Sequence, residues 1–355
     1  MDQRHQVILI ILGLVVFGVL MVYDASSAQA LQQFNDKYYF VKDQIKWVAL
    51  GLAGATIASF FDYRALKHLA VPILIGCLVS LIAVFLPGIG VHAYGASRWI
   101  NLGFTVIQPS ELAKLSLIIY LAAWLTTKEK GRLLPFFLLV GLLVGLIILE
   151  PDMGTAIVLF GTALVMYYLS DSSLLGLLSI LPVVLTGGIL LALKSPYRLK
   201  RIVSFLDPES DPFGASYHIR QALIALGSGG FLGLGLGNSR QKYSYLPEAM
   251  TDSIFAIIGE ELGLIGTTAL VVVFGVLFVR AIRLTLLVDD TFGRLLGMGI
   301  VSYLAIQTLV NFGSIVGLIP LTGVPLPFLS YGGSALIVEL VSVGILVNIW
   351  KVHRR

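Results

Sequence analysis

The sequence predicts an all-α, polytopic membrane protein with about ten transmembrane helices. Of its 355 residues, 57% are hydrophobic and only 12% are charged, and its mean hydropathy is +0.92. These values lie outside the usual range of soluble globular domains. The apolar runs are too long and too uniform for barrel strands, and in lipid only helices or closed barrels satisfy every backbone polar group. We therefore expect residues 1–355 to form one helical membrane domain.

Ten apolar segments can be drawn along the chain, and an even number puts both termini on one side. The segments are 6–24, 44–61, 68–87, 109–126, 134–150, 152–169, 173–193, 252–281, 294–318 and 334–350. With the termini inside, the cytoplasmic side carries twelve basic residues and the short outer loops carry four. The positive-inside rule therefore favours cytoplasmic termini. This distribution accounts for the net charge of +4, so no nucleic-acid partner is expected.

The longest connection, 194–251, is extracytoplasmic in this topology. It begins with basic residues, among them Arg198 and Arg201, and continues through the acidic stretch Asp207-Pro-Glu-Ser-Asp211. It then carries an uncharged run, Gly227–Gly237, with six glycines. We expect this run to lie at the membrane interface or to re-enter beside the bundle, because non-helical backbone at membrane depth must line protein or water. A phosphate-cradling loop is the alternative, although no strand precedes the run.

The stretch Leu246–Gly263 brings carboxylates into an otherwise apolar sequence. Thr251 or Asp252 can cap the helix that follows, and the other interpretation of Asp252 is a catalytic carboxylate at the membrane surface. Glu260 and Glu261 lie roughly 12 Å further in along the helix. Ionisable groups at that depth must face the protein interior or a water-filled cavity.

The fourth segment begins on the outer side with Gln108-Pro-Ser-Glu-Leu-Ala-Lys114. Glu111 is well placed to bind free amides of the first helical turn, and Lys114 shares its helix face. A local ion pair with a lysine that snorkels to the surface is one interpretation. The other is a basic pocket, formed with Arg98, that binds an anionic headgroup.

The tight outer turn between the fifth and sixth segments contains Glu150 and Asp152. Asp152 can cap the sixth helix. Glu150 stands at a helix C-terminus, where the helix dipole disfavours an anion. We therefore expect Glu150 to have a partner or a function.

The segment Pro320–Ser334 precedes the last span and has three prolines and three glycines, so it cannot be a plain helix. Backbone amides of Ser330, Tyr331, Gly332 and Gly333 can form an anion-binding nest at the start of the final helix, and the tyrosine can stack on a sugar. A purely structural broken helix is the alternative.

Carboxylates and cations thus gather on the outer side. The carboxylates are Glu111, Glu150, Asp152, Glu248 and Asp252; the cations are Arg98, Lys114, Arg198, Lys200, Arg201, Arg220, Arg240 and Lys242. Transfer of a group from a lipid-linked diphosphate needs both, because cations stabilise the departing diphosphate while a carboxylate removes a proton from the attacking hydroxyl. No Cys or His cluster indicates a transition metal, whereas a divalent cation, Mg²⁺ or Mn²⁺, could bridge carboxylate and diphosphate.

Motifs along nearly the whole chain resemble those of the SEDS family (shape, elongation, division and sporulation). They are Gly95-Ala-Ser-Arg-Trp-Ile, Gln108-Pro-Ser-Glu-Leu-Ala-Lys, Glu150-Pro-Asp-Met-Gly-Thr, Arg201-Ile-Val-Ser-Phe-Leu-Asp-Pro, Leu246-Pro-Glu-Ala, Gly259-Glu-Glu-Leu-Gly and Pro325-Leu-Pro-Phe-Leu-Ser-Tyr-Gly-Gly-Ser. The family comprises integral membrane glycosyltransferases that polymerise lipid II into peptidoglycan glycan strands. The chain is more similar to the cell-division member than to the elongation member, and the resemblance implies ten helices with a large loop between the seventh and eighth.

The resemblance also implies roles for individual residues. Asp252 matches the family's essential loop aspartate, and Glu111 and Lys114 match residues that line its central cavity. This chain departs from the family pattern at Met250, where a histidine is usual, and at Ser253, where a phenylalanine is usual.

The expected function is therefore septal lipid II polymerisation at the outer face of the bacterial cytoplasmic membrane. Asp252 would be the general base, and loop cations such as Arg198, Arg201 and Lys242 would hold the diphosphate. The implied partners are lipid II, undecaprenyl diphosphate, a class B penicillin-binding transpeptidase and other divisome membrane proteins. A lipid II flippase, a non-catalytic divisome scaffold and an elongation role are the alternatives.

Overall fold

The computed structural model describes residues 3–93, 96–101, 103, 105–127, 131–170, 186–187, 196–207, 214, 216–243 and 245–352. Within these ranges it contains eleven α-helices and one three-stranded sheet. The helices are α1 (Gln3–Phe34), α2 (Tyr39–Phe60), α3 (Ala65–Ala83), α4 (Pro109–Leu125), α5 (Leu133–Leu149), α6 (Met153–Leu169), α8 (Pro196–Leu206), α9 (Tyr217–Ser228), α10 (Ile254–Leu286), α11 (Thr291–Ile315) and α12 (Gly333–Val352).

Nine of the ten predicted spans coincide with helices α1 to α6 and α10 to α12. Two predicted regions lie mostly outside the described residues: the span 173–193 and the acidic stretch from residue 207. Five of the helices, α1, α3, α10, α11 and α12, are long and apolar enough to cross a bilayer by themselves, and α5 and α6 are shorter apolar helices. The helical prediction is confirmed, and the chain is a multi-pass membrane protein.

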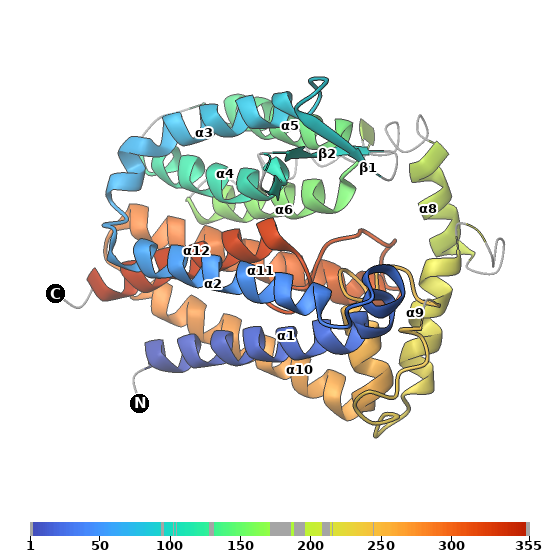
Figure 1. Cartoon of the computed structure of the whole chain (residues 1–355). Helices are drawn as coiled ribbons and strands as arrows, with labels where there is room; N and C mark the ends of the chain where they lie inside the picture. Colours follow the sequence, from blue (N-terminus) through green and yellow to red (C-terminus); the bar gives the residue numbers. More distant parts are fainter. Residues whose placement is uncertain are drawn as a thin grey trace.

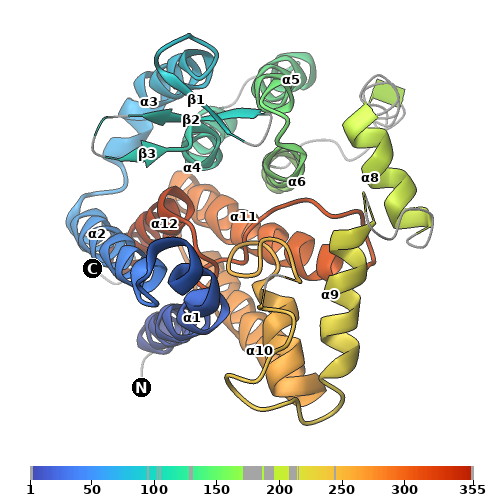
Figure 2. The same ribbon diagram turned by 45° about the vertical axis from the view of Figure 1, so that its right-hand side comes forward.

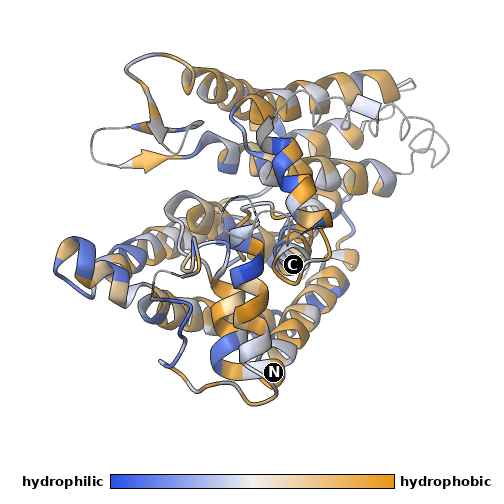
Figure 3. Ribbon diagram, turned by 90° about the vertical axis from the view of Figure 1, so that its right-hand side faces the viewer, coloured by the Kyte–Doolittle hydropathy of each residue, from blue (hydrophilic) through white to orange (hydrophobic). Residues whose placement is uncertain are grey.

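Helices α11 and α12 lie in the middle of the bundle (Figures 1 and 2). In the most hydrophobic stretches of α11 and α12, 72% and 78% of the residues are buried, against 22% in α3 and 28% in α10. Helix α12 packs against α2, while α11 packs against α4, α6 and α10. The peripheral helices carry many exposed apolar residues, which suits helices that face lipid. Figure 3, coloured by hydropathy, shows how apolar the helices of the bundle are along their length.

The connection between α3 and α4 forms a small antiparallel sheet that the sequence analysis missed. Strands β1 (Gly90–Ala93), β2 (Ala96–Asn101) and β3 (Val106–Ile107) pair in the order β1-β2-β3. This connection lies between two helices rather than within a span, so a sheet with open edges does not conflict with the rule for lipid-exposed backbone. Strand β2 carries Arg98 toward the turn between α5 and α6.

Helix α10 is interrupted at Gly263, whose φ of 66° and ψ of −166° are not helical. The interruption leaves carbonyl groups of the preceding turn without partners inside the helix. The Gly-rich run, Gly227–Gly237, provides hydrogen-bond donors for these carbonyls. The amides of Leu234 and Gly235 donate to the carbonyls of Glu260 and Glu261, each at 3.0 Å.

The amides that follow the interruption are satisfied in the same way. Leu264 donates to the carbonyl of Gly230 at 2.9 Å, and Ile265 donates to the carbonyl of Phe231 at 3.2 Å. Four backbone hydrogen bonds therefore join the run to α10. The run therefore packs beside the bundle, which is one of the two positions predicted for it.

The carboxylates of Glu260 and Glu261 bind the rest of the returning loop. Glu260 accepts hydrogen bonds from Ser239 Oγ at 2.5 Å and from the Arg240 amide at 3.0 Å. Glu261 accepts from the amides of Gly237 at 3.1 Å and Ser239 at 3.0 Å. The prediction that both glutamates face the protein interior is confirmed. Because these amides already donate to protein, the phosphate-cradling alternative is wrong for them.

Replacing Gly233 with alanine is expected to lower the free energy of unfolding by about 1–3 kcal/mol. Gly233 has a φ of +78°, and a Cβ there would overlap the carbonyl oxygen of Glu261. The matched control is Gly227→Ala, because Gly227 lies inside α9 and a Cβ there meets nothing within 4 Å. Thermal unfolding in detergent measures both variants. Equal melting temperatures for the two would contradict a docked Gly233.

Candidate active site

Asp252 follows the long connection 194–251, just before α10 begins at Ile254. Its side chain is buried. Nδ2 of Asn311, in the central helix α11, donates to the backbone carbonyl of Asp252 at 2.8 Å and to that of Val324 at 2.8 Å. Asn311 therefore holds the Asp252 loop against the segment Pro320–Ser334.

The predicted cap at the start of α10 is wrong. The N-cap position is Ser253, and neither Thr251 nor Asp252 occupies it. The Thr251 hydroxyl instead donates to the Glu248 carboxylate at 2.8 Å. Asp252 is thus a buried carboxyl group that the structure does not use to begin the helix.

The surroundings of Asp252 adjust its acidity. Burial raises the pKa of Asp252 to about 7, the nearby Glu248 carboxylate adds to the rise, and the Arg201 guanidinium opposes it. A carboxyl group with a pKa near the working pH is suited to general base catalysis, because it exchanges protons readily in both directions. The role of Asp252 as a general base stays a prediction.

A cavity of about 320 Å³ lies between α8 and α9, which stand together at one side of the bundle in Figure 2. Its lining residues are Lys200, Arg201, Ser204, Phe205, His218, Ile219 and Leu321. Arg201 also acts on the charge of Asp252 and donates to the carbonyl of Leu321 at 2.7 Å. The cavity therefore presents two cations beside the candidate base, and its volume suits part of a small ligand.

His218 is a neighbour of the site that the sequence analysis did not select. Its Nε2 lies 2.7 Å from Oγ of Ser253. Burial and the Arg201 guanidinium lower the pKa of His218 to about 4, so its imidazole is neutral at pH 7. One sequence feature could have indicated this contact: Ser253 is polar where the family usually has an aromatic residue. Nothing in the sequence around His218 indicates the contact.

Two predicted cations bind the turn between α5 and α6. Arg98 donates to the carbonyls of Glu150, at 3.0 Å, and Pro151, at 2.5 Å, and Arg198 donates to the carbonyl of Ile148 at 2.9 Å. Cations suit this position because carbonyls at a helix C-terminus carry partial negative charge. These contacts go to the backbone of the turn, and a diphosphate contact for either arginine stays a prediction.

The two carboxylates of the same turn differ. Asp152 caps α6, as predicted, by accepting from the Thr155 amide at 3.0 Å. Glu150 is fully buried, and within the described part of the chain neither of its carboxylate oxygens has a hydrogen-bond partner. Burial raises the pKa of Glu150 to about 8, and the charge of Asp152 adds to this. The prediction was a partner or a function for Glu150; the described residues give its carboxylate no hydrogen-bond partner, and a function stays a prediction.

Glu111 and Lys114 lie inside the bundle, with side chains only 3% and 1% exposed. Their charged atoms are 2.8 Å apart, which confirms the local ion pair. Nζ of Lys114 also donates to Oε1 of Gln307 at 2.6 Å, and Nε2 of Gln307 donates to Glu339 at 2.9 Å. Lys114 does not snorkel to the surface; a chain of polar groups from α4, α11 and α12 holds it inside.

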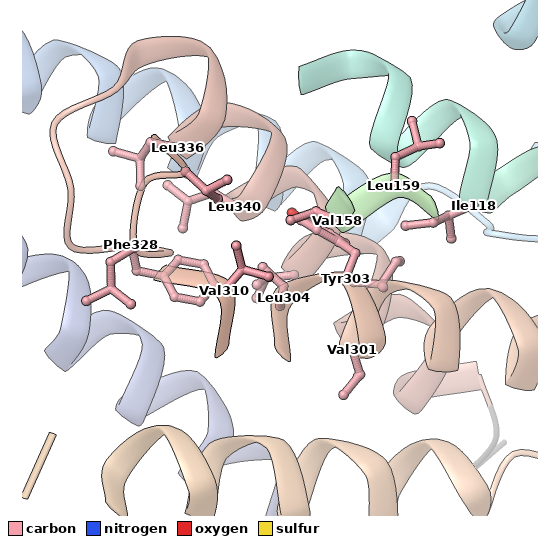
Figure 4. Packing of buried hydrophobic residues seen from close by; sticks show 14 of the residues in the cluster. Ile118, Val158, Leu159, Val301, Tyr303, Leu304, Val310, Phe328, Leu336 and Leu340 are labelled. Carbon is pink, nitrogen blue, oxygen red and sulfur yellow. The ribbon is translucent and has the colours of Figure 1, made fainter. Parts of the chain in front are cut away.

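Apolar side chains surround this polar chain. Tyr303 lies with its ring 5.6 Å from Nζ of Lys114, and it packs in the core with residues such as Leu304, Val158 and Leu340, labelled in Figure 4. Glu111 and Lys114 have each other and Gln307 as partners. A substrate contact at either residue stays a prediction.

Lys242 forms ion pairs with Asp24 of α1 at 2.8 Å and with Glu261 of α10 at 3.0 Å. Two carboxylates therefore balance its charge, and its predicted contact with diphosphate is not tested. Among the described ranges, no group of three or more His, Cys, Asp or Glu side chains is arranged to hold a metal ion.

In the segment before α12, the first two residues of the predicted anion nest, Ser330 and Tyr331, bind backbone carbonyls of the protein. The Ser330 amide donates to the carbonyl of Leu326 at 3.1 Å, and the Tyr331 amide donates to the carbonyl of Met250 at 2.8 Å. The Ser330 hydroxyl donates to the carbonyl of Thr251 at 2.6 Å. An anion nest that includes these two amides is therefore wrong. The segment instead fixes the backbone of the two residues before Asp252.

The remaining nest residues pack against α2. Tyr331 donates through its hydroxyl to Asp43 at 2.8 Å, and its ring meets Phe40 edge-on. A Cβ at Gly333 would contact the Trp47 ring, so close packing there requires glycine. These packing contacts do not test whether Tyr331, Gly332 or Gly333 binds a sugar or an anion, so that role stays a prediction.

Comparison with known proteins gives relatives that match almost the whole chain. The chain is 43% identical over 355 residues to the probable peptidoglycan glycosyltransferase FtsW of Geobacter metallireducens, covering 98% of this chain and 95% of the relative. It is 40% identical over 353 residues to the stage V sporulation protein E of Bacillus subtilis, covering 98% and 96%.

Solved structures share the fold. A chain of a peptidoglycan synthase complex has a TM-score of 0.80 at 27% identity and covers 99% of this chain and 98% of its own length. The rod shape determining protein RodA of Thermus thermophilus has a TM-score of 0.73 at 26% identity and covers 99% and 97%. The sequence profile of the FtsW, RodA and SpoVE family, described as a cell cycle protein, matches residues 4–355. The chain therefore belongs to the FtsW, RodA and SpoVE family.

Proposed function

We propose that this protein is a peptidoglycan glycosyltransferase that polymerises lipid II into glycan strands during septal wall synthesis. The observation that carries the proposal is Asp252, a buried carboxyl group with a pKa of about 7 beside a cavity that contains Lys200 and Arg201. The name and 43% identity of the Geobacter metallireducens relative support the activity. The likeness to a chain of a peptidoglycan synthase complex supports it independently.

Asp252 acts as the general base in this reaction. Its carboxylate accepts the proton of the acceptor sugar hydroxyl while the hydroxyl oxygen forms a bond to the anomeric carbon of the donor. The bond from that carbon to the diphosphate breaks, and the electron pair leaves with undecaprenyl diphosphate. Direct displacement inverts the anomeric carbon, which converts the α-linked diphosphate of lipid II into a β-linked glycan.

Lys200 and Arg201 bind the departing diphosphate in the cavity beside Asp252. Cations held in place before the reaction stabilise the charge that develops on the leaving group. Arg198, on the same helix α8, and Glu248, close enough to raise the pKa of Asp252, complete the proposed substrate surface. A divalent cation is compatible with carboxylate and diphosphate oxygens as ligands.

The proposed topology has both termini in the cytoplasm and the connection 194–251 on the outer face, within one domain of residues 1–355. The excess of basic residues on the opposite side supports it. The proposed partners are a class B penicillin-binding transpeptidase and other divisome membrane proteins. A division role is supported by relatives named FtsW, whereas roles in elongation and sporulation belong to the wider family.

Polymerisation in detergent micelles tests the activity. Purified protein is combined with its transpeptidase partner, which has no glycosyltransferase activity of its own, and with lipid II. Glycan strands are expected, and they cannot result from transport because micelles have no second compartment. Absence of strands under conditions where a related enzyme works would contradict the proposal. Lipid II transfer across liposomes by the same preparation would then favour a flippase, and no transfer would favour a scaffold.

A further inference from the structure

The tip of the Gly-rich run is the most exposed apolar part of the outer connection among the described residues. The side chains of Phe231, Leu232 and Leu236 are 74%, 79% and 66% exposed. The run that carries them lies at an edge of the molecule beside α9 and α10 (Figure 1). Exposed apolar side chains grouped at a loop tip indicate an interaction surface.

Part of the backbone of this run is bonded to protein, as described for the interruption of α10. Carbonyls of Gly230 and Phe231 accept from α10, and amides of Leu234 and Gly235 donate to it. Non-helical backbone is tolerated at membrane depth when its polar groups are paired in this way. These paired groups lie on both sides of Leu232, so the run can present its apolar side chains to lipid while its backbone stays bonded to α10.

Two polar contacts between α1 and α10 define how deep the run lies. Arg280 of α10 donates to Gln6 near the start of α1, and Lys242 joins Asp24 of α1 to Glu261 of α10. The helical rise puts roughly 27 Å between the two levels along α1 and roughly 28 Å along α10. This separation is close to the hydrocarbon thickness of a bilayer, about 30 Å.

The interruption of α10 lies inside that slab. Leu264 and Ile265, which bind the carbonyls of Gly230 and Phe231, are three and four residues past Glu261. They are therefore roughly 5 Å inside the outer boundary of the hydrocarbon. Both side chains are exposed, so the apolar tip of the run continues the lipid-facing stripe of α10.

We propose that residues 229–237 form a re-entrant membrane loop whose tip, at Phe231 and Leu232, inserts into the hydrocarbon of the outer leaflet. The occupant of this surface is the acyl chains of bilayer lipids. Leu236 lies nearer the boundary, because the flanking amides of Gly235 and Gly237 bind the backbone carbonyl and the carboxylate of Glu261. The inference does not depend on the catalytic role of Asp252.

Spin labels at single cysteines test the insertion in liposomes that contain only the purified protein and phospholipid. Cys77 is the only cysteine and is replaced by serine. Labels are attached to Leu232→Cys and Leu236→Cys, with Val271→Cys on the exposed face of α10 as the lipid reference and Lys37→Cys in an outer loop as the water reference. Collisions with oxygen report hydrocarbon, and collisions with a water-soluble nickel chelate report solvent.

The oxygen-to-nickel collision ratio rises with depth in the hydrocarbon. The ratio at Leu232 is therefore expected well above that at Lys37 and below that at Val271, because the tip lies roughly 5 Å and Val271 roughly 15 Å inside the boundary. The ratio at Leu236 should fall between those of Leu232 and Lys37. A Leu232 ratio equal to that of Lys37 would overturn the proposal in favour of a solvent-exposed loop. Low collision rates with both reagents would overturn it in favour of a protein contact, such as a second copy. A label at Phe231→Cys repeats the measurement if Leu232→Cys does not fold.

Discussion

Replacing Asp252 with asparagine is expected to slow lipid II polymerisation by about 10²–10⁴-fold, the usual contribution of a general base. Asparagine keeps the size of the side chain, and the hydrogen bond from Asn311 goes to the backbone of residue 252, so it is retained. The rate is measured with purified protein and the transpeptidase partner. Asp36→Asn is the matched control, because Asp36 is a solvent-accessible carboxylate paired with Lys42.

The pH dependence of the wild-type rate provides a second test of Asp252. A base works only when deprotonated, and the pKa of Asp252 is raised to about 7, so kcat should rise with pH through about 7 and then level off. Arg201 lowers this pKa; Arg201→Met should therefore move the rise to higher pH. Equal rates for Asp252→Asn and wild type, or an unmoved profile in the arginine variant, would mean that the base lies elsewhere.

Replacing Lys242 with methionine is expected to lower the free energy of unfolding by about 3–5 kcal/mol, because it leaves buried carboxylates without their cation. Lys242 is buried and pairs with both Asp24 and Glu261. Its loss also frees the returning loop from α1. Thermal unfolding of the detergent-purified protein measures the change.

The matched control for this substitution is Lys46→Met. Lys46 is exposed and lies 3.7 Å from Asp43, and such surface pairs contribute about 0–1 kcal/mol. Adding Asp24→Asn and Glu261→Gln to Lys242→Met should recover part of the stability, because the uncompensated charges are then removed. Equal melting temperatures for Lys242→Met and Lys46→Met would show that the buried lysine is not a structural link.

The linear sequence was sufficient for the spans, because each requires only a long apolar run and lipid permits few structures other than a helix. It also determined local features that depend on neighbouring residues: the Asp152 cap on α6 and the ion pair between Glu111 and Lys114. Both involve groups three residues apart, which lie together on a helix or at its beginning.

The tertiary structure decided which polar groups meet across the bundle. Lys242 and Asp24 are 218 residues apart in the chain, and His218 and Ser253 are 35 apart; no local pattern indicates either pair. The interruption at Gly263 was equally hidden, because glycine is compatible with a helix and only the docked loop provides partners for the open backbone groups. Side-chain periodicity reports which face of a segment is apolar, whereas contacts between distant segments depend on how the helices pack.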